Sequence, residues 1–492
     1  MKNKSKNRFL AGLFSITAAL GAPFILAGCN TDVFANENPG VYVTNIKKAD
    51  TASDGSNNYI ITYSDGNNSI ITIEPNNTEN KTSIVDALFN KYLEIHPTAT
   101  YEEFLREYLS TPSDNRQVVN KCLNSCLKIY TEFATTSLDF FYREQKSVSV
   151  MCGSAIIYKM DKSDNPDENY TYVITNYHVV YNANANEDND NGSNFPRRIV
   201  GYMYGSEDSP KQGQTGSDGY QTYDYGEYGI EFEYVGGSID HDIAILKTNT
   251  SNLLAINGNA QPVEMADGYQ VGETAIAIGN PENAGISVTE GVVSVDNEYI
   301  ALSIDGNIRY YRSIRMDTSI YGGSSGGGLF NTEGKLIGVT NAGDGTDQNI
   351  NYAVPVEVVK AVASNILRNY DGNSKSTAKK IKLGIEVNGI ESKYIYDATM
   401  NQSNIVEKIV IVKVENDCLA RNSLGLKIDD VLKSVKINDT VVSFNRYFEI
   451  GDALLDIKAG DTICFTVERL NDNNELETIE LDAYAVLASD LN

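Results

Sequence analysis

The chain has 492 residues, enough for roughly two or three domains, and its 66 acidic residues outnumber 40 basic ones to give a formal net charge of −26. So strong an acidic excess argues against nucleic acid as a partner, because the phosphate backbone would repel the chain. An anionic membrane surface would repel it as well, so its own charge would not hold it at a membrane.

The first residues have the composition of an export signal. A basic head, Lys2 to Arg8, precedes an apolar stretch, Phe9 to Leu26, that ends in Leu26-Ala27-Gly28-Cys29. The ending resembles the bacterial lipoprotein box, in which the cysteine is acylated and becomes the new N-terminus. We therefore expect residues 1–28 to be a lipoprotein signal peptide and acylated Cys29 to anchor the exported chain to the outer face of the bacterial cell membrane. An ordinary signal peptide and an uncleaved anchor helix are the alternatives.

Residues 29–80 are predicted to form a tether that contains a β-hairpin. Two alternating stretches, Tyr59–Tyr63 and Ser69–Ile73, flank a polar segment with an Asp-Gly turn. Residues 81–145 are predicted to be helical.

That helical region contains three predicted helices. Two short ones lie at 83–89 and 101–105, and apolar residues recur at helical spacing from Arg116 to Tyr142. We interpret the N-terminal region as a spacer or docking element.

A histidine and a carboxylate follow two predicted strands. His178 lies at the end of the apolar run Tyr172–Val180, which can pair with the upstream run Gly153–Ile157. Asp242 directly precedes another apolar run, and a carboxylate there can orient an imidazole and stabilise its protonated form. Asp240 is a competing candidate for the same role.

The segment 181–228, between this histidine and the aspartates, is rich in Asn, Asp, Gly and Tyr. Its run Asp188–Gly192 suggests calcium, but the glycine falls one place early for an EF-hand loop and no acid closes the loop. We therefore expect a solvated surface loop that could cover the substrate cleft, and no metal site.

The stretch Asp317–Phe330 places five glycines around two adjacent serines and ends in an apolar pair. A second apolar run, Lys335–Val339, follows, so the glycines lie at the entrance to a buried strand, where the backbone can turn sharply. Such a turn can expose one hydroxyl and direct neighbouring N–H groups to one point, as a serine nucleophile with an oxyanion hole requires. The alternative is a Gly/Ser surface loop, and Ser324 competes with Ser325.

These segments, in the order His, Asp, Ser, resemble the chymotrypsin-like serine proteases and, more narrowly, the HtrA/Deg family. The matching motifs are Gly153-Ser154-Ala155, Thr175-Asn176-Tyr177-His178-Val179-Val180, Asp242-Ile243-Ala244-Ile245-Leu246, Gly279-Asn280-Pro281, Val288-Thr289-Glu290-Gly291-Val292-Val293-Ser294, Gly323-Ser324-Ser325-Gly326-Gly327 and Asn351-Tyr352-Ala353-Val354-Pro355.

The resemblance implies a catalytic triad of His178, Asp242 and Ser325. Ser325 would be the nucleophile, since the Gly-x-Ser-Gly-Gly frame selects it over Ser324, and His178 would be the general base and acid. The backbone N–H groups of Gly323 and Ser325 would form the oxyanion hole. The resemblance also implies a double β-barrel over residues 146–370, no metal or organic cofactor, and assembly into a homotrimer.

After a polar linker at 371–380, residues 381–486 resemble a PDZ module. The matching segments are Lys382–Ile385, Ile409–Val414, Cys418–Ala420, Leu424–Leu432 and Lys458–Asp461.

A PDZ module binds an extended peptide as an added strand, and here backbone N–H groups of Leu383, Gly384 and Ile385 would hold its terminal carboxylate. The long stretch Glu386–Glu407 departs from the family pattern. Another small β-rich domain is the alternative.

Cysteine spacing leaves several readings open. Cys122 and Cys126 would lie on one face of a helix as two buried thiols. Cys152 has no partner after the histidine, and Cys418 and Cys464 could pair in the C-terminal domain.

Together these patterns predict a mainly β protein, in which a chymotrypsin-like double β-barrel is followed by a PDZ-like α+β domain and preceded by a small α/β region. The predicted function is an HtrA-type serine endopeptidase that acts on exported, unfolded or misassembled proteins. Its partners would be protein or peptide substrates and the lipid membrane. The alternatives are a catalytically silent, lipid-anchored PDZ binding protein or chaperone, and a protease for one dedicated partner.

Overall fold

The computed structural model describes three strands near the N-terminus and most of the chain from residue 115. The described residues are 43–51, 57–63, 68–73, 89, 93, 97, 100, 101 and 115–491, except 164, 166–167, 188, 344–346, 348, 373–374, 398–401 and 472. Residues 1–28, Cys29 and His96 lie outside them, as do all but single residues of the helices predicted at 83–89 and 101–105. In the described part, no helix is both long and apolar enough to cross a membrane.

The chain divides into two compact units, Met1–Pro112 and Ser113–Asn492. Apart from the single residues 89, 93, 97, 100 and 101, the described part of the first unit is an antiparallel sheet in the order β1-β2-β3. Its strands are β1 Val43–Thr51, β2 Asn57–Tyr63 and β3 Asn68–Ile73. The pairing of β2 with β3 confirms the predicted hairpin. The sequence analysis missed β1, in which several charged residues dilute the apolar pattern.

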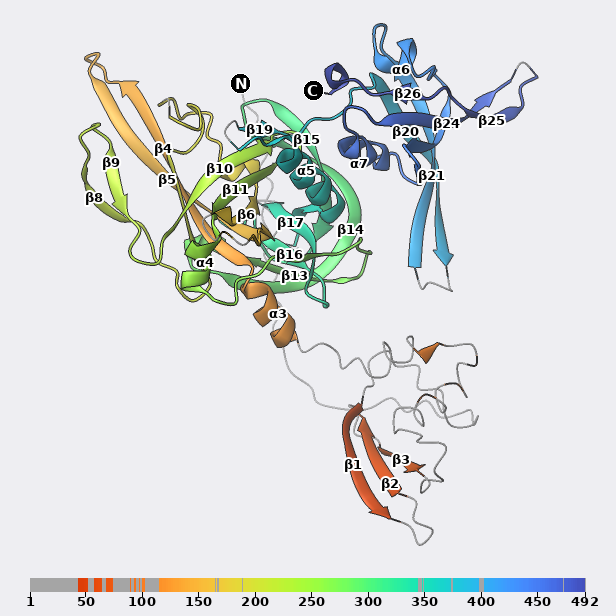
Figure 1. Ribbon diagram of the computed structural model, residues 1–492, viewed down its shortest axis with the longest axis horizontal. Coiled ribbons are helices and arrows are strands. Elements are labelled where there is room, and N and C mark those ends of the chain that lie inside the picture. The colour runs from red at the N-terminus through yellow and green to blue at the C-terminus, as the bar shows by residue number, and fades with distance from the viewer. Residues whose placement is uncertain are drawn as a thin grey trace, which may run out of the picture. The chain divides into compact units, whose positions relative to one another are not determined.

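The second unit begins with a helix, α3 Asn115–Leu123, and a seven-stranded sheet (Figure 1). The strands of this sheet are β4 Cys126–Leu138, β5 Glu144–Met160, β6 Tyr170–Thr175, β7 Arg198–Met203, β10 Ile230–Ser238, β11 Ile243–Asn249 and β19 Ser376–Thr377. In the order β11-β6-β5-β4-β7-β10 they close into a barrel, because β10 also pairs with β11. Beyond the barrel, β4 and β5 continue as a long two-stranded arm (Figure 1).

A second seven-stranded sheet follows and also closes on itself. Its strands are β12 Glu264–Met265, β13 Thr274–Gly279, β14 Ser287–Ser303, β15 Ile308–Met316, β16 Gly328–Phe330, β17 Lys335–Gly343 and β18 Asn351–Pro355. The barrel order is β17-β16-β13-β14-β15-β18, closed by β17 against β18. The mainly β, double-barrel fold predicted from sequence is therefore confirmed.

The two barrels share one apolar core. Ile174 and Ile245 of the first barrel belong to the same buried cluster as Ile276 and Phe330 of the second. A short helix, α4 Thr250–Ile256, connects the barrels, and helix α5 Val356–Asn369, which directly follows the second barrel, adds its apolar face to this cluster. We call the junction between the two barrels the seam, and loops from both barrels meet there.

The predicted helix from Arg116 to Tyr142 is wrong beyond Leu123. From Cys126 the chain is strand β4, and its first nine residues are all buried. A strand buried on both faces shows no alternation, so its apolar residues can also satisfy a helical spacing. Because β4 pairs with β5, the barrel begins before residue 146.

Two segments predicted to be loops contain strands. The segment 181–228 includes β7, a barrel strand, and the hairpin of β8 Lys211–Thr215 and β9 Gln221–Asp224. The predicted linker 371–380 includes β19, which adds to β10 in parallel. Backbone pairing with the first barrel orders both segments, which polar composition alone does not reveal.

The C-terminal domain is a sheet in the order β20-β21-β22-β24-β25 with two short helices. Its elements are β20 Ile385–Asp397, β21 Gln402–Val414, α6 Leu419–Asn422, β22 Val431–Ile437, β23 Thr440–Ser443, α7 Glu449–Asp456, β24 Thr462–Leu470, β25 Leu476–Glu480 and β26 Tyr484–Ala485. The stretch Glu386–Glu407 lies in the pairing of β20 with β21, which extends away from the domain as a second arm (Figure 1).

Candidate active site

The candidate base and its carboxylate come together at the edge of the first barrel. β6 ends at Thr175, and a single 3₁₀ turn, Tyr177–Val179, places His178 beside the start of β11. The imidazole Nδ1 lies 2.8 Å from Oδ2 of Asp242, and the backbone N–H of His178 donates to Oδ1 at 3.0 Å. Both carboxylate oxygens therefore bind the same residue, which fixes the orientation of the ring.

Asp242 itself is held in an unusual backbone conformation. Its side chain is fully buried, and its φ of 53° lies in the left-handed region that non-glycine residues rarely adopt. The side-chain amide of Asn176 donates to the Asp242 carbonyl oxygen at 2.8 Å. Asp240, the competing candidate, lies elsewhere and forms an ion pair with Arg309 at 2.8 Å.

The electrostatic environment favours the protonated imidazole. Burial lowers the pKa of His178, but the charge of the Asp242 carboxylate and its hydrogen bond outweigh this effect, so the net shift is upward from 6.5. The neighbouring His241 behaves in the opposite way: burial and the charge of Lys380 lower its pKa to about 4. The first histidine can therefore accept a proton during a reaction, whereas the second stays neutral.

The two adjacent serines have different environments. Ser324 is buried, and its hydroxyl accepts a hydrogen bond from the N–H of Tyr321 at 3.4 Å. Ser325 is partly exposed, and its hydroxyl donates to the carbonyl oxygen of Asn341, on β17, at 3.3 Å. Only the second hydroxyl is therefore placed where a substrate could reach it.

A glycine in the left-handed region shapes the loop before Ser325. Gly323 has a φ of 98°, and a Cβ there would lie 2.4 Å from the Asn280 carbonyl oxygen, so only glycine fits. The Gly322 carbonyl accepts a hydrogen bond from the N–H of Glu282 at 2.7 Å. Because the C=O and N–H of a trans peptide point in opposite directions, the N–H of Gly323 faces away from Glu282.

A serine of the first barrel fixes this loop to the seam. The N–H of Ser154, on β5, donates to the Ser325 carbonyl at 2.8 Å. Its hydroxyl donates to the Gly323 carbonyl at 2.8 Å and accepts from the N–H of Asn280 at 2.9 Å. The neighbouring Gly153 brings the two halves of the site together, because a Cβ there would lie 2.6 Å from Val179 and 3.3 Å from the Ser325 carbonyl.

Sequence reasoning named candidate site residues but not all of the groups that position them. It assigned no role to Ser154, Asn176, Asn280 or Asn341. The first three fall inside motifs that carried the resemblance, and this was the one signal that could have singled them out. Asn341 is 3% exposed, and neither polar atom of its side chain has a hydrogen-bond partner in the described part of the chain.

The predicted peptide-binding residues of the C-terminal domain lie at the beginning of the edge strand β20. The Leu383 carbonyl accepts from the N–H of Ala420 at 3.0 Å, and Gly384 adopts a φ of 77°. A cavity of about 370 Å³ adjoins Gly384, lined by Lys382 and by three acidic residues. The acidic residues are Glu415, Asp417 and Asp490. Ile385 begins the strand and pairs with Val414.

The described cysteines are free thiols. Cys122 and Cys126 are both buried, as predicted, although one lies on a helix and the other on a strand. Cys418 and Cys464 do not form the disulfide that the sequence left open. The calcium alternative at 188–192 is only partly covered by the structure. There the amides of Asn189 and Asn191 bond to the backbone carbonyls of Phe195 and Pro196.

Comparison with known proteins gives the same class of enzyme. Residues 153–339 match the trypsin-like peptidase domain family. The serine protease Do-like HtrA of Lactococcus lactis subsp. lactis is 25% identical over 65% of this chain and 68% of its own length. The serine endoprotease DegS of Haemophilus influenzae is 30% identical over 45% of this chain and 65% of its own length.

A solved structure, HtrA-type protease AlgW with tripeptide, has a TM-score of 0.45 at 20% identity and covers 75% of this chain and 96% of that one. The curated relatives are aligned over about two thirds of their own length. The chain thus carries a trypsin-like serine endopeptidase domain of the kind found in the HtrA and DegS proteases.

Proposed function

We propose that this chain is an HtrA-type endopeptidase in which Ser325 is the nucleophile, His178 the general base and acid, and Asp242 the orienting carboxylate. The observation that carries the proposal is the contact of His178 with both oxygens of a buried carboxylate, beside the glycine-rich loop. The substrates would be exported proteins that are unfolded or misassembled, since such chains offer the extended backbone that a protease cleft binds.

The reaction would proceed by acyl transfer. The hydroxyl of Ser325 leaves the Asn341 carbonyl, turns toward the imidazole and attacks the scissile carbonyl while His178 takes its proton. Asp242 stabilises the resulting imidazolium, and the N–H groups of Gly323 and Ser325 bind the oxyanion. His178 then protonates the leaving amine, and water releases the acyl group by the same steps in reverse.

Casein cleavage by the chain from Asn30, beside Ser325→Ala and Ser324→Ala, tests the assignment. We expect only Ser325→Ala to abolish cleavage, because the Ser324 hydroxyl is buried within the loop. If the parent chain cuts nothing and an organophosphonate does not label Ser325, the silent binding protein becomes the better proposal. Labelling without cleavage would indicate a dedicated substrate or a latent enzyme.

We also propose that residues 381–486 act as a PDZ-like module that follows the segment 371–380, in which β19 still pairs with the first barrel. The support is the position of β20 at the edge of its sheet, where an added peptide strand could pair. A peptide with a free C-terminal carboxylate should bind more tightly than its amidated form. Equal binding would argue against carboxylate capture by Leu383, Gly384 and Ile385, as would preference for the amide.

Attachment to the membrane through acylated Cys29 is proposed from the lipoprotein-like ending of the signal, which would place the enzyme outside the cell membrane. Cys29→Ser should release the protein from washed membranes into the soluble fraction. Retention of this variant in the membrane fraction would contradict anchoring through an acyl group on Cys29. A homotrimer is proposed from the family resemblance alone, and sedimentation of the chain from Asn30 tests it.

A further inference from the structure

The arm formed by β4 and β5 ends in three consecutive exposed aromatic residues. Phe140, Phe141 and Tyr142 are 91%, 70% and 85% exposed, and Leu138 beside them is 61% exposed. These residues do not support the barrel core, which lies at the other end of the arm. Apolar side chains concentrated at a protruding tip indicate a contact with something outside the described chain.

The turn that carries these rings is preformed. The Asp139 carboxylate accepts from the N–H groups of Phe141 and Arg143 at 2.8 and 2.9 Å, and the Arg143 guanidinium donates to it at 2.9 Å. Phe140 and Phe141 pack edge to face with centroids 5.5 Å apart. The aromatic residues are thus presented outward with little conformational entropy left to lose on binding.

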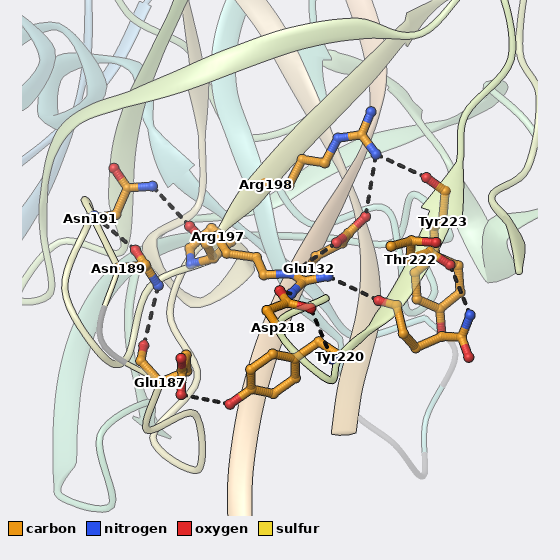
Figure 2. Close-up of polar contacts among 12 residues, drawn as sticks. Glu132, Glu187, Asn189, Asn191, Arg197, Arg198, Asp218, Tyr220, Thr222 and Tyr223 are labelled. Carbon is orange, nitrogen blue, oxygen red and sulfur yellow. Dashed lines mark hydrogen bonds and ion pairs between the residues drawn. The ribbon is translucent and has the colours of Figure 1, made fainter. Parts of the chain in front are cut away.

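The arm itself is braced by the segment 181–228. Figure 2 shows the buried Glu132 of β4 beside Arg197, 3.2 Å from its Nε, and the Tyr220 hydroxyl 2.6 Å from Glu187. The same hydroxyl lies 2.6 Å from Oγ1 of Thr136, farther along β4. These contacts fix the direction of the arm relative to the barrel, so that the position of the tip is defined with respect to the active site.

We propose that this aromatic tip inserts into the interfacial region of a lipid bilayer. Three rings of about 200 Å² each, with the exposures given above, present roughly 500 Å². A stable protein interface covers about 800 Å² on each partner, so the tip alone is small for a protein partner, whereas a bilayer sets no such minimum. Aromatic residues also favour the membrane–water interface, where the rings are apolar and a hydroxyl such as that of Tyr142 stays hydrated.

Charge supports a lipid partner of low charge. The chain is strongly acidic, but the charged residues at the tip cancel: Asp139 and Glu144 against Arg143 and Lys146. The end of the arm can therefore approach a bilayer without the repulsion that the rest of the surface would meet. This inference rests on the proposed membrane attachment, which brings the chain to a bilayer. A second contact through the tip would set the orientation of the protease cleft.

A single tryptophan reporter tests the insertion directly, because the chain contains no tryptophan. Phe140→Trp is made in the chain from Asn30, which has no acyl group, and phosphatidylcholine vesicles are added. We expect the emission to shift to shorter wavelength and to be quenched by lipids brominated on their acyl chains. Leu476→Trp, on the 55% exposed Leu476 of the β24–β25 hairpin, is the matched control and should show neither change.

Vesicle flotation supplies the second measurement. Phe140→Ser with Phe141→Ser should weaken partitioning by at least about tenfold, because each removes most of a large apolar side chain. Leu470→Ser with Leu476→Ser should leave it unchanged. Casein cleavage in solution is measured on all variants. It tests the proposed enzymatic function independently of vesicle binding, and unchanged cleavage shows that a variant is folded. Equal flotation of the two double variants would overturn the inference. So would a tip variant that changes the oligomeric state without vesicles, which would indicate a second copy as the partner.

Discussion

Ser154 offers the sharpest test of how the seam supports the candidate oxyanion hole. Its side chain is 1% exposed and makes two hydrogen bonds, to the Gly323 carbonyl and from the N–H of Asn280. Ser154→Ala keeps the strand and the backbone bond to the Ser325 carbonyl but removes both hydroxyl contacts. The loop then keeps one of its two hydrogen bonds to Ser154, and the N–H of Asn280 loses its bond to that residue.

The magnitude follows from the two groups that lose a partner. A polar group left unsatisfied in a buried setting costs about 1–3 kcal/mol, so two such groups, one of them partly exposed, cost about 2–4 kcal/mol in the folded state. If Gly323 shifts from its proposed position and the transition state thereby loses about 2 kcal/mol of stabilisation, kcat/KM falls roughly thirtyfold. Complete loss of one oxyanion donor would cost about 100- to 1,000-fold.

Steady-state cleavage of a peptide substrate, active-site titration and denaturant unfolding would be measured together. Ser147→Ala is the control, since Ser147 is an exposed serine of the same strand and the substitution should change stability by less than about 0.5 kcal/mol. A fall in kcat with KM little changed would locate the effect in the transition state. Unchanged kcat/KM and stability in Ser154→Ala would refute the proposed support of the loop.

Three further changes follow from the candidate site and from a contact with the C-terminal domain, in which Arg312 on β15 lies 2.5 Å from Asp452 on α7. Asn176→Ala removes the amide that holds Asp242 at a φ of 53°. It should lower kcat/KM by about 10- to 100-fold and, by releasing the carboxylate, lower the imidazole pKa measured by NMR; an unchanged pKa would contradict this. For His241, whose folded pKa is depressed to about 4, stability is full above the unfolded value of 6.5 and is lost as pH falls toward about 4. His241→Asn should recover up to about 3 kcal/mol of unfolding free energy at acid pH and none at neutral pH. Burial raises the pKa of Asp452 to about 7 despite its pairing with Arg312, so its contribution to stability is full at low pH and is lost as pH rises through about 7. Asp452→Asn should flatten the stability profile between about pH 4 and about pH 7, and an unaltered slope would show that another group is responsible.

Local patterns in the sequence were sufficient for much of the fold. The runs around His178 and Asp242 combine apolar strand residues with a polar residue at the strand end, and the glycines around Ser325 mark a turn that few other residues can form. These signals depend on neighbours in sequence. The structure accordingly has β6, β11 and β16 where such runs predict strands.

Strand β4 shows where that reasoning fails. The predicted helix continued through Cys126 because the apolar residues that follow are buried on both sides, by the barrel core on one face and by residues of the segment 181–228 on the other. A period of two residues appears only when one face is exposed. The information that decides between helix and strand is therefore held by β5 and β7, which pair with β4 from distant parts of the chain.

The same argument applies with more force to the groups that support the candidate triad. Ser154 lies in the first barrel, but its hydroxyl partners, Gly323 and Asn280, belong to the second, and no spacing in the sequence relates them. Asn176 donates to the backbone carbonyl of Asp242 and not to its side chain. Every residue type has such a carbonyl, so the sequence does not indicate that these two residues interact. Sequence can thus single out candidate groups whose chemistry is unusual, such as a candidate nucleophile in a glycine turn. Groups that only hold others in place become visible once the two barrels are closed against each other, because their role is defined by the seam and not by the residue.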